Sequence, residues 1–472
     1  MLDLIPLFAR WKNSFARVNR LPPEILTRVA QFSSLHDLYA GLRVCRYWYN
    51  VLMSPEVWSE IDLDRIEEAQ IFLIRSKEVP ADIGITQRPG GIQLSILSAC
   101  SSRIRSLQIS SGAVSRDLLT HFSVTPAPLM RDLRITRDGH SPTYFRLPST
   151  FFTGNLPSLR TLVLSDISSD FTRLVLPNLT TFELRDVGDP DATLSPSSLL
   201  NFLARSPLLE RLHLDYRSHY DDAVSPRRIV ALHHLKWVYI NGEPLTPVDT
   251  SRSLLAHLSL PAGVVVNLWV YIHGSDTDVV ARTIPFHHDL IPCTKSLKEI
   301  RFHHLLRSCF AAFSGDNGCF TINASLQGEY EAGATMAICS FGSLDVSGVQ
   351  TLVVEYYGYT HHYLTQALKS LVNLRSLTLK QCVNEPPLHA LCQEGTSPRL
   401  RYLAMDLPRH RVWATNLLEM AKVRKLRGHG LETLSLHLSS SDNLVGDTSS
   451  LREYVGSIQC TIGRGPTRSV IR

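Results

Sequence analysis

One spacing of apolar residues recurs along most of the chain. In it, an apolar residue is followed three positions later by a second and two positions after that by a third. Alternate residues of a β strand point to the same side, so each copy predicts a short strand with one buried face. The copies begin at Ile104, Met130, Leu159, Leu179, Leu209, Leu235, Leu255, Leu297, Val349, Leu374, Leu400 and Leu431.

The stretches between several copies have the apolar spacing of helices. One helix is predicted from Ser198 to Arg205, after a cap at Ser195. Another is predicted from about His362 to Leu371. Most copies start 20 to 31 residues apart, which is the period of leucine-rich repeats. The sequence therefore predicts an α/β fold in which parallel strands and outer helices form an irregular leucine-rich-repeat solenoid.

The repeat pattern is interrupted in places. Only the copy from Leu374 to Cys382 also carries the asparagine or cysteine that follows the strand in regular leucine-rich repeats. Between Leu260 and Val349 there is one clear copy. We expect an additional strand at Val265-Leu268-Val270 in this segment. We also expect an insert near residues 303–345, with a hairpin around Cys319 to Ile338.

Before the repeats, the run from Leu21 to Leu63 predicts three short helices and a strand. Pro22 and Pro23 suit the first turn of a helix, and Ser34 with Asp37 is a capping-box-like start for the second. So small a unit buries too little apolar surface to be stable alone, so we expect it to lean on a partner and on the repeats. The apolar positions that define these elements are Ile25, Leu26, Val29, Leu35, Leu38, Tyr39, Leu42, Cys45, Trp48, Val51, Leu52, Trp58, Ile61 and Leu63.

This run resembles the F-box motif. The resemblance rests on Leu21-Pro22-Pro23-Glu24-Ile25-Leu26, Asp37-Leu38, Val44-Cys45-Arg46, Trp48 and Trp58. It implies docking on the Skp adaptor and, through that adaptor, on a cullin. The adaptor-binding residues that it implies are Leu21, Pro22, Ile25, Leu26, Val44, Cys45 and Trp48. Two positions depart from the family pattern, Ala30 and Phe32. The alternative is a generic amphipathic helical hairpin inside a larger domain.

These patterns give the domain organisation. We expect an N-terminal helix or extension over residues 1–20, the F-box over 21–63, the repeat region over 64–440 and a C-terminal tail over 441–472. The first twenty residues place apolar side chains on one helical face with basic residues around it. An organelle-targeting helix is one reading of that pattern, and a helix that packs against the F-box is the one we prefer.

Composition indicates an intracellular protein. The nine cysteines have no closely paired spacing, which favours free thiols in a reducing compartment. No apolar run has the length of a membrane span, and we expect the cytoplasm or the nucleus. A net charge of +5 over 472 residues is too dilute to argue for nucleic acid. The basic run from Lys422 to Arg427 before Gly428 predicts the last turn of a helix.

The motifs of catalysis that we searched for are missing from the sequence. There is no glycine-rich phosphate loop, no nucleophile elbow and no His-Glu-x-x-His helix. Adjacent histidines on a strand point in different directions and lack nearby ligands at metal spacing. We therefore expect no metal, no cofactor and no catalytic residue. The histidine pairs in question are His233-His234, His287-His288, His303-His304 and His361-His362.

The residues beside the inward leucines should point out of the sheet, and neighbouring repeats should align them. Tryptophan, tyrosine and arginine are the residues that most often anchor protein interfaces. The predicted target-binding residues are Arg211, His213, Trp237, Tyr239, His257, Trp269 and Arg301. The alternative is that Trp237 and Trp269 pack against the flanking insert.

Together these features predict a non-catalytic substrate-recognition subunit of an SCF-type (Skp, cullin, F-box) E3 ubiquitin ligase. The F-box would bind the Skp adaptor and the repeats an unidentified target protein, with no nucleic acid and no membrane partner. The main alternative is a leucine-rich-repeat interaction scaffold that transfers no ubiquitin. An enzyme built on the array is the third hypothesis, and no nucleophile, base and orienting group occur together to support it.

Overall fold

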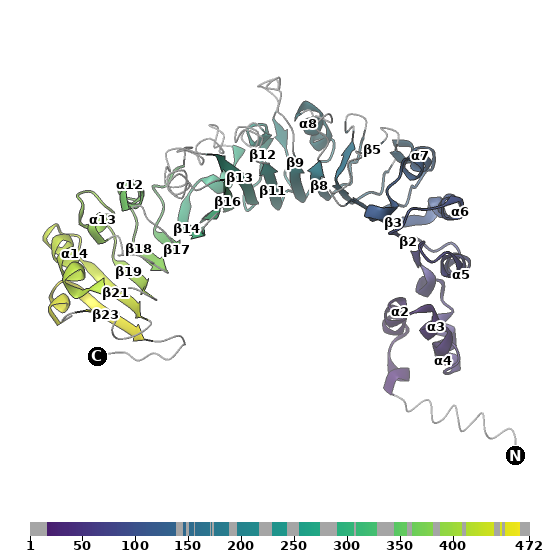
Figure 1. Cartoon of the computed structure of the whole chain (residues 1–472), viewed down its shortest axis with the longest axis horizontal. Coiled ribbons are helices and arrows are strands. Elements are labelled where there is room, and N and C mark those ends of the chain that lie inside the picture. Colours follow the sequence, from purple (N-terminus) through teal and green to yellow (C-terminus); the bar gives the residue numbers. More distant parts are fainter. Residues whose placement is uncertain are drawn as a thin grey trace, which may run out of the picture. The chain divides into compact units, whose positions relative to one another are not determined.

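The computed structural model divides the chain into two compact units, Met1–Leu209 and Glu210–Arg472 (Figure 1). The residues that the structure describes are 17–137, 145–147, 151–154, 156–169, 171, 174–187, 196–216, 229–242, 254–273, 290–305, 308–327, 344–355, 361–380, 388–407, 412–438, 444–445 and 449–462. The predicted N-terminal helix lies mostly outside this set, and its last residues form the 3-10 helix η1 (Arg17–Arg20).

The first unit begins with the three predicted short helices. They are α2 (Pro23–Gln31), α3 (Leu35–Gly41) and α4 (Arg46–Leu52), followed by the 3-10 helix η2 (Pro55–Trp58). Proline occupies the first turn of α2, where an amide hydrogen would lack a helical partner. The Ser34 hydroxyl oxygen accepts the amide of Asp37 and caps α3. The capping prediction is therefore confirmed.

The rest of the first unit is a parallel sheet with helices between its strands. The strands pair in the order β1 (Glu60–Asp62), β2 (Ala81–Ile85), β3 (Ile104–Ile109), β4 (Asp132–Thr136), β6 (Thr161–Ser165) and β8 (Thr181–Val187). A separate pair is formed by β5 (Phe145–Leu147) and β7 (Ile167–Ser169). The helices are α5 (Ile66–Ser76), α6 (Gly91–Cys100), α7 (Arg116–Val124) and α8 (Pro196–Ala204), with the 3-10 helices η3 (Ser101–Arg103), η4 (Ser111–Ala113) and η5 (Phe151–Gly154).

The sheet of the second unit is mostly parallel. Its strands pair in the order β9 (Arg211–Tyr216), β11 (Trp237–Gly242), β13 (Val265–His273), β16 (Gly318–Gln327), β15 (Ser308–Gly315), β14 (Leu297–Leu305), β17 (Thr351–Glu355), β18 (Ser376–Lys380), β19 (Tyr402–Leu407), β21 (Leu431–Leu438) and β23 (Val455–Ile462). In Figure 1, α12 (His361–Ser370), α13 (Leu388–Cys392) and α14 (Ala414–Leu426) lie on one side of β17 to β21.

Strands β14, β15 and β16 interrupt the parallel order. After β13 the chain forms β14, which pairs with β17, and then returns through the antiparallel strands β15 and β16 to reach β13. The described residues contain a hairpin formed by β15 and β16, with its turn at Asp316 and Asn317, and it lies within the sheet. It precedes the position predicted around Cys319 to Ile338, of which only β16 is described. Residues 328–343 of the predicted insert lie outside the described residues.

The apolar spacing identifies the core correctly. The second and third apolar residues of all twelve copies are buried, from Leu107 to Leu436. A common turn precedes many of the strands, because the amide of the first apolar residue donates to the carbonyl three residues earlier. These bonds are Met130 to Ala127, Leu159 to Leu156, Leu179 to Leu176, Leu209 to Ser206, Leu235 to Leu232, Val349 to Val346, Leu374 to Leu371 and Leu400 to Ser397.

The structure corrects the prediction in two places. The copy at Leu255 does not supply a strand of the main sheet, because within the described residues β12 (Leu258–Ser259) pairs with β10 (Val230–Ala231) alone. The neighbour of β11 is instead the additional strand β13, with Val266 and Leu268 buried. The segment assigned to a C-terminal tail contains β22 (Leu444–Val445), paired with β20 (Val412–Trp413), the 3-10 helix η10 (Ser449–Glu453) and the last strand β23.

Candidate functional site

The first candidate site is an exposed apolar surface on the three N-terminal helices. Eighteen large apolar side chains are exposed among the described residues, and eight of them fall between Val18 and Met53. Exposed apolar side chains are ordinary when scattered singly, and their concentration in one stretch of the chain makes this stretch a candidate interaction surface. The eight are Val18, Ile25, Val29, Phe32, Tyr39, Val44, Tyr49 and Met53.

The predicted adaptor-binding residues divide into exposed and buried ones. Ile25 and Val44 are 50% and 52% exposed, and Pro22 is exposed as well. Leu21, Cys45 and Trp48 are half-buried. Leu26 is only 1% exposed, because it lies on the inward face of α2. Its assignment to the binding surface is therefore corrected, and Leu26 belongs to the core of this domain.

Hydrogen bonds hold α4 against the segment that precedes α2. The indole Nε1 of Trp48 donates to Asn19 Oδ1 at 2.8 Å, and the hydroxyl of Tyr47 donates to the carbonyl of Leu21. These bonds fix Leu21 and Trp48, which are distant in the sequence, in one part of the domain. The resemblance had placed both in the same surface.

Helix α2 presents an apolar stripe that extends beyond the predicted residues. Ile25, Val29 and Phe32 are all exposed and are spaced by four and three positions, so they follow one face of the helix. The guanidinium of Arg28 lies 5.0 Å from the centre of the Phe32 ring. Phe32 had been taken as a departure from the family pattern. The helical spacing, continued to the end of α2, was the signal that could have included Val29 and Phe32 in the surface.

The helical domain is attached to the sheet through a shared core. Trp58 is completely buried, donates from Nε1 to the carbonyl of Leu52 at 2.8 Å, and meets the ring of Phe72 on α5 edge-on at 5.1 Å. The guanidinium of Arg75, also on α5, lies 4.3 Å from the Trp58 ring centre. Strand β1 follows directly and pairs with β2. The helices therefore do not form a separate core.

The second candidate site is on the open face of the second unit's sheet, the side to which residues between the buried ones point. Arg211 and His213 on β9 pair in register with Trp237 and Tyr239 on β11. The Trp237 and Tyr239 rings are nearly parallel with centres 5.9 Å apart, and His213 lies 4.3 Å from Tyr239. The Arg211 guanidinium lies 4.6 Å from the Trp237 ring centre, within cation–π range. These four residues form the aromatic cluster.

Trp269 extends the cluster by one strand. It pairs in register with Asn241, and both side chains are half-buried. The indole Nε1 of Trp269 and the Oδ1 of Asn241 are both buried without a hydrogen-bond partner. One is a donor and the other an acceptor, on neighbouring strands. The Asn241 amide already donates to Asp215 Oδ1 at 2.9 Å.

The remaining two predicted target-binding residues lie elsewhere. His257 is 9% exposed and sits just before β12, outside the main sheet, so it is not on the open face. Arg301 is exposed on β14 and pairs with Glu299 at 2.6 Å. Two strands, β16 and β15, separate it from Trp269, a distance of about 14 Å at the usual strand spacing. On the intervening strands, Thr321 and Ala312 are in register with Arg301, and Asn323 and Phe310 are in register with Trp269.

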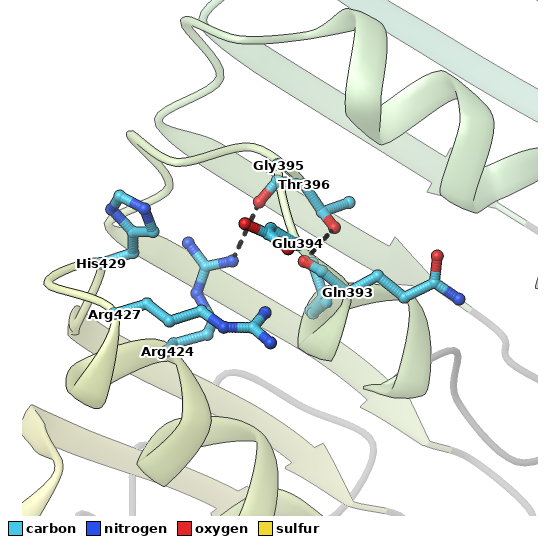
Figure 2. A pocket seen from close by; sticks show the side chains of 8 residues that line it. Gln393, Glu394, Gly395, Thr396, Arg424, Arg427 and His429 are labelled. Atoms are coloured by element: carbon cyan, nitrogen blue, oxygen red, sulfur yellow. Dashed lines mark hydrogen bonds between the residues drawn. The ribbon is translucent and has the colours of Figure 1, made fainter.

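A cavity of about 300 Å³ lies beside α13 and α14. Figure 2 shows Gln393, Glu394, Thr396, Arg424, Arg427 and His429 among the residues that line it. Arg424 is 2% exposed, and burial lowers its pKa to about 10. Its two terminal nitrogens donate to the carbonyls of Thr396 and Ser397, while Arg427 donates to the carbonyl of Cys392 at 2.6 Å. Both arginines therefore satisfy carbonyl groups at and beyond the end of α13. Helix α14 ends at Leu426, with Arg424 and Lys425 in its last turn. The prediction that this basic run ends a helix is therefore confirmed.

The described residues contain no group of three or more His, Cys, Asp and Glu side chains that could hold a metal ion. Of the histidine pairs, His233 and His234 are exposed, and His287 and His288 lie outside the described residues. None of the helices that the structure describes has the length and apolar character needed to cross a bilayer.

A comparison with known families addresses the N-terminal helices. A family model described as F-box-like matches residues 18–64, which run from η1 to just beyond β1. The match covers the stretch in which the exposed apolar side chains are concentrated. F-box proteins are typically non-catalytic adaptors, and the domain suggests an SCF-type adaptor role in which it binds Skp and so a cullin. The chain therefore carries an F-box-like domain followed by a mixed α/β region with a large, mostly parallel sheet.

Proposed function

We propose that this protein is the substrate-recognition subunit of an SCF-type E3 ubiquitin ligase. The F-box-like domain binds the Skp adaptor, and the sheet region binds a target protein. The observation that carries this proposal is the apolar surface of residues 18–53, with Ile25 and Val44 half-exposed, inside the stretch that matches the family model. In an isolated chain this surface costs free energy, and a partner removes it from water.

We infer that the sheet region is an irregular leucine-rich-repeat solenoid. Recurring parallel strands, the common turn before them and the buried apolar pairs support this inference. Neighbouring repeats are joined by the same kind of backbone bond. The amide of Lys236 donates to the carbonyl of Glu210, and that of Arg375 to the carbonyl of Gln350, each at 2.8 Å. The insertion of β15 and β16 is the main irregularity.

The aromatic cluster is the proposed target-binding site. Its rings and the Arg211 guanidinium contact one another, so they are held in place before a target arrives. Preorganised side chains lose less conformational entropy on binding. The protein performs no chemistry itself. It holds the target near the ubiquitin-conjugating enzyme that carries ubiquitin. The rate of ubiquitin transfer rises because the effective concentration of the target is higher.

The first test is capture of the purified Skp adaptor by the full chain. The Ile25→Glu, Val44→Glu double variant places two charges on the exposed surface without altering a buried position. We expect adaptor affinity to fall at least tenfold, because a charge buried in an apolar interface is unpaired. Ile74→Glu is the matched control, since Ile74 is 75% exposed on α5, outside the F-box-like domain.

Either of two outcomes would contradict the proposal: no capture by the wild type, or equal capture by the double variant. A second measurement separates a ligase subunit from a non-ligase scaffold. Targets captured by the wild type but not by a Trp237→Ala, Tyr239→Ala variant are followed for abundance and ubiquitylation. Turnover that requires both the aromatic cluster and the pair Ile25 and Val44 identifies a ligase. Stable targets whose ubiquitylation is unaffected by either variant identify a scaffold.

A further inference from the structure

Arg131 and Arg160 lie just before the neighbouring strands β4 and β6 of the first unit's sheet, and they have no part in the proposed function. We call the position two residues before the first inward residue of a strand the edge position. For β3, β4, β6 and β8 it is occupied by Arg105, Arg131, Arg160 and Thr180. Backbone bonds connect these positions: the amide of Arg131 donates to Arg105, that of Arg160 to Arg131 and that of Thr180 to Arg160. Arg131 and Arg160 therefore start from neighbouring strands, about 5 Å apart.

A cavity of about 370 Å³ lies between these two arginines and the turns beside them. Its other lining residues are Pro157, Ser158, Asn178, Thr180 and Leu208, so no acidic side chain lines it. The Asn178 amide donates to the carbonyl of Pro157 at 2.7 Å, and the Thr180 hydroxyl donates to the carbonyl of Arg160 at 3.1 Å. These bonds fix the wall of the cavity against the backbone that carries Arg160.

Asp132, beside Arg131 in the sequence, acts electrostatically on Arg105, and no carboxylate among the described residues pairs with the arginines of this cavity. Neither the Arg131 nor the Arg160 guanidinium forms an ion pair or a side-chain hydrogen bond with any of them. At the same edge position Arg105 pairs with Asp82, with Nε 2.9 Å from Oδ1. In the second unit, Arg401 at the equivalent position lies 3.7 Å from Glu432. Like charges on neighbouring strands repel, so an anion in this cavity would relieve that repulsion.

We propose that this cavity binds a phosphoryl group. Each guanidinium presents a planar fork of N–H donors that matches two oxygens of a phosphate, and the Ser158 hydroxyl adds a further donor. A phosphoryl group carries about −1.5 to −2 charges at neutral pH and so balances both arginines. A single carboxylate would balance one. This site is independent of the adaptor-binding surface and of the aromatic cluster.

The test is binding of inorganic pyrophosphate to the full chain, measured by calorimetry at constant ionic strength with chloride as the reference anion. We expect the Arg131→Gln, Arg160→Gln variant to bind at least tenfold more weakly than the wild type. The matched control is Arg375→Gln, Arg401→Gln, which removes the equivalent edge pair of the second unit and should bind like the wild type. All three proteins should melt at similar temperatures because these arginines are exposed.

Equal binding by the wild type and the Arg131→Gln, Arg160→Gln variant would overturn the proposal, as would a wild type that does not prefer pyrophosphate to chloride. A second arm identifies the source of the phosphoryl group. It uses a short glycine and alanine peptide around one phosphoserine, compared with inorganic phosphate. Tighter binding of the peptide indicates a phosphorylated protein segment. Binding no tighter than inorganic phosphate indicates a small phosphorylated molecule. Adaptor capture, measured on the same variants, should not change.

Discussion

The helices of the F-box-like domain and the strands of the second unit differ in how completely they bury their apolar residues. The helical domain buries a small core, Ala30, Leu38, Leu52, Val57 and Trp58, and leaves eight large apolar side chains exposed. In the second unit's sheet the inward residues of neighbouring strands, such as Leu214 and Ile240, are fully buried. Its open face carries polar, aromatic and small side chains.

This difference separates two ways of gaining stability. Each strand of the sheet is covered by its neighbours, so the sheet completes its core without another protein. The helical domain borrows part of its core from α5, through Phe72 and Ile71, and still exposes Ile25 and Val44. The comparison suggests that substitutions should be most harmful where the helices join α5, severe on the inward face of the sheet, and mild on either exposed surface.

The largest effect is expected from Trp58→Ala. It removes a completely buried indole, its hydrogen bond to the carbonyl of Leu52 and its contact with Phe72. We expect the free energy of unfolding of this region to fall by about 3 to 5 kcal/mol. Hydrogen exchange should show lost protection in α2 to α5 with normal protection in β17 to β21. Equal loss in both regions would contradict a core confined to the helices and α5.

The same residue type can be compared at an inward and an outward position. Ile240→Ala opens a cavity in the fully buried face of β11 and should cost about 2 to 5 kcal/mol. Ile25→Ala, on the half-exposed face of α2, should change stability by no more than about 0.5 kcal/mol. Denaturant unfolding of the two variants measures both values. Similar losses would mean that the two regions do not differ in the way described.

Gly318 follows the β15–β16 turn, and Gly263, just before β13, donates its amide to the carbonyl of Asn317 in that turn. The two glycines therefore test how tightly the turn is packed. Gly318 has a φ of +120°, and an added Cβ would overlap the carbonyl oxygen of Val264. Gly318→Ala should therefore destabilise the protein by about 2 to 3 kcal/mol. Gly263 has a φ of +85° but open space around the Cβ position, so Gly263→Ala should cost about 1 kcal/mol. Thermal unfolding of both variants should show the larger loss of stability for Gly318→Ala, and the reverse order would contradict this packing of the turn.

The smallest effect on stability is expected on the open face. Trp237→Ala removes a half-buried ring that contacts Tyr239 and Arg211. Cation–π and ring contacts at such partly exposed positions contribute about 1 kcal/mol or less to stability. The same variant should lose the captured target, so its affinity should fall while its unfolding midpoint barely changes. A large loss of stability would instead assign Trp237 to the core.

Much of this arrangement could be predicted from the sequence, because burial imposes a local pattern. The spacing of Leu235, Val238 and Ile240 marks an inward face wherever it occurs, and it places Trp237 and Tyr239 on the opposite face without further information. The register between β9 and β11 then brings Arg211 and His213 to the same cluster. The F-box motif is similarly local, since its residues fall within one short run.

Other features depend on contacts that no local pattern specifies. The residues of β15 and β16 alternate like those of any strand, and alternation is the same in parallel and antiparallel pairs, so their order within the sheet was missed. The copy at Leu255 is as apolar as the others, and only the pairing of β13 with β11 shows that its strand lies outside the main sheet. The pair Arg131 and Arg160 was missed because edge residues follow no apolar rule.

The reversed order of β14, β15 and β16 has a consequence for synthesis of the chain. A regular array can add one unit at a time as the polypeptide emerges, because each strand docks on the one made just before it. Here β14 emerges before the strands that connect it to β13, and the edge of β13 stays open until Cys319 and the residues after it have been made. Residues from β13 to β16 must therefore fold as one block. We expect the folding of this block to be the slowest step during translation. An unpaired strand edge is also exposed longest at this stage, which makes aggregation most favourable there.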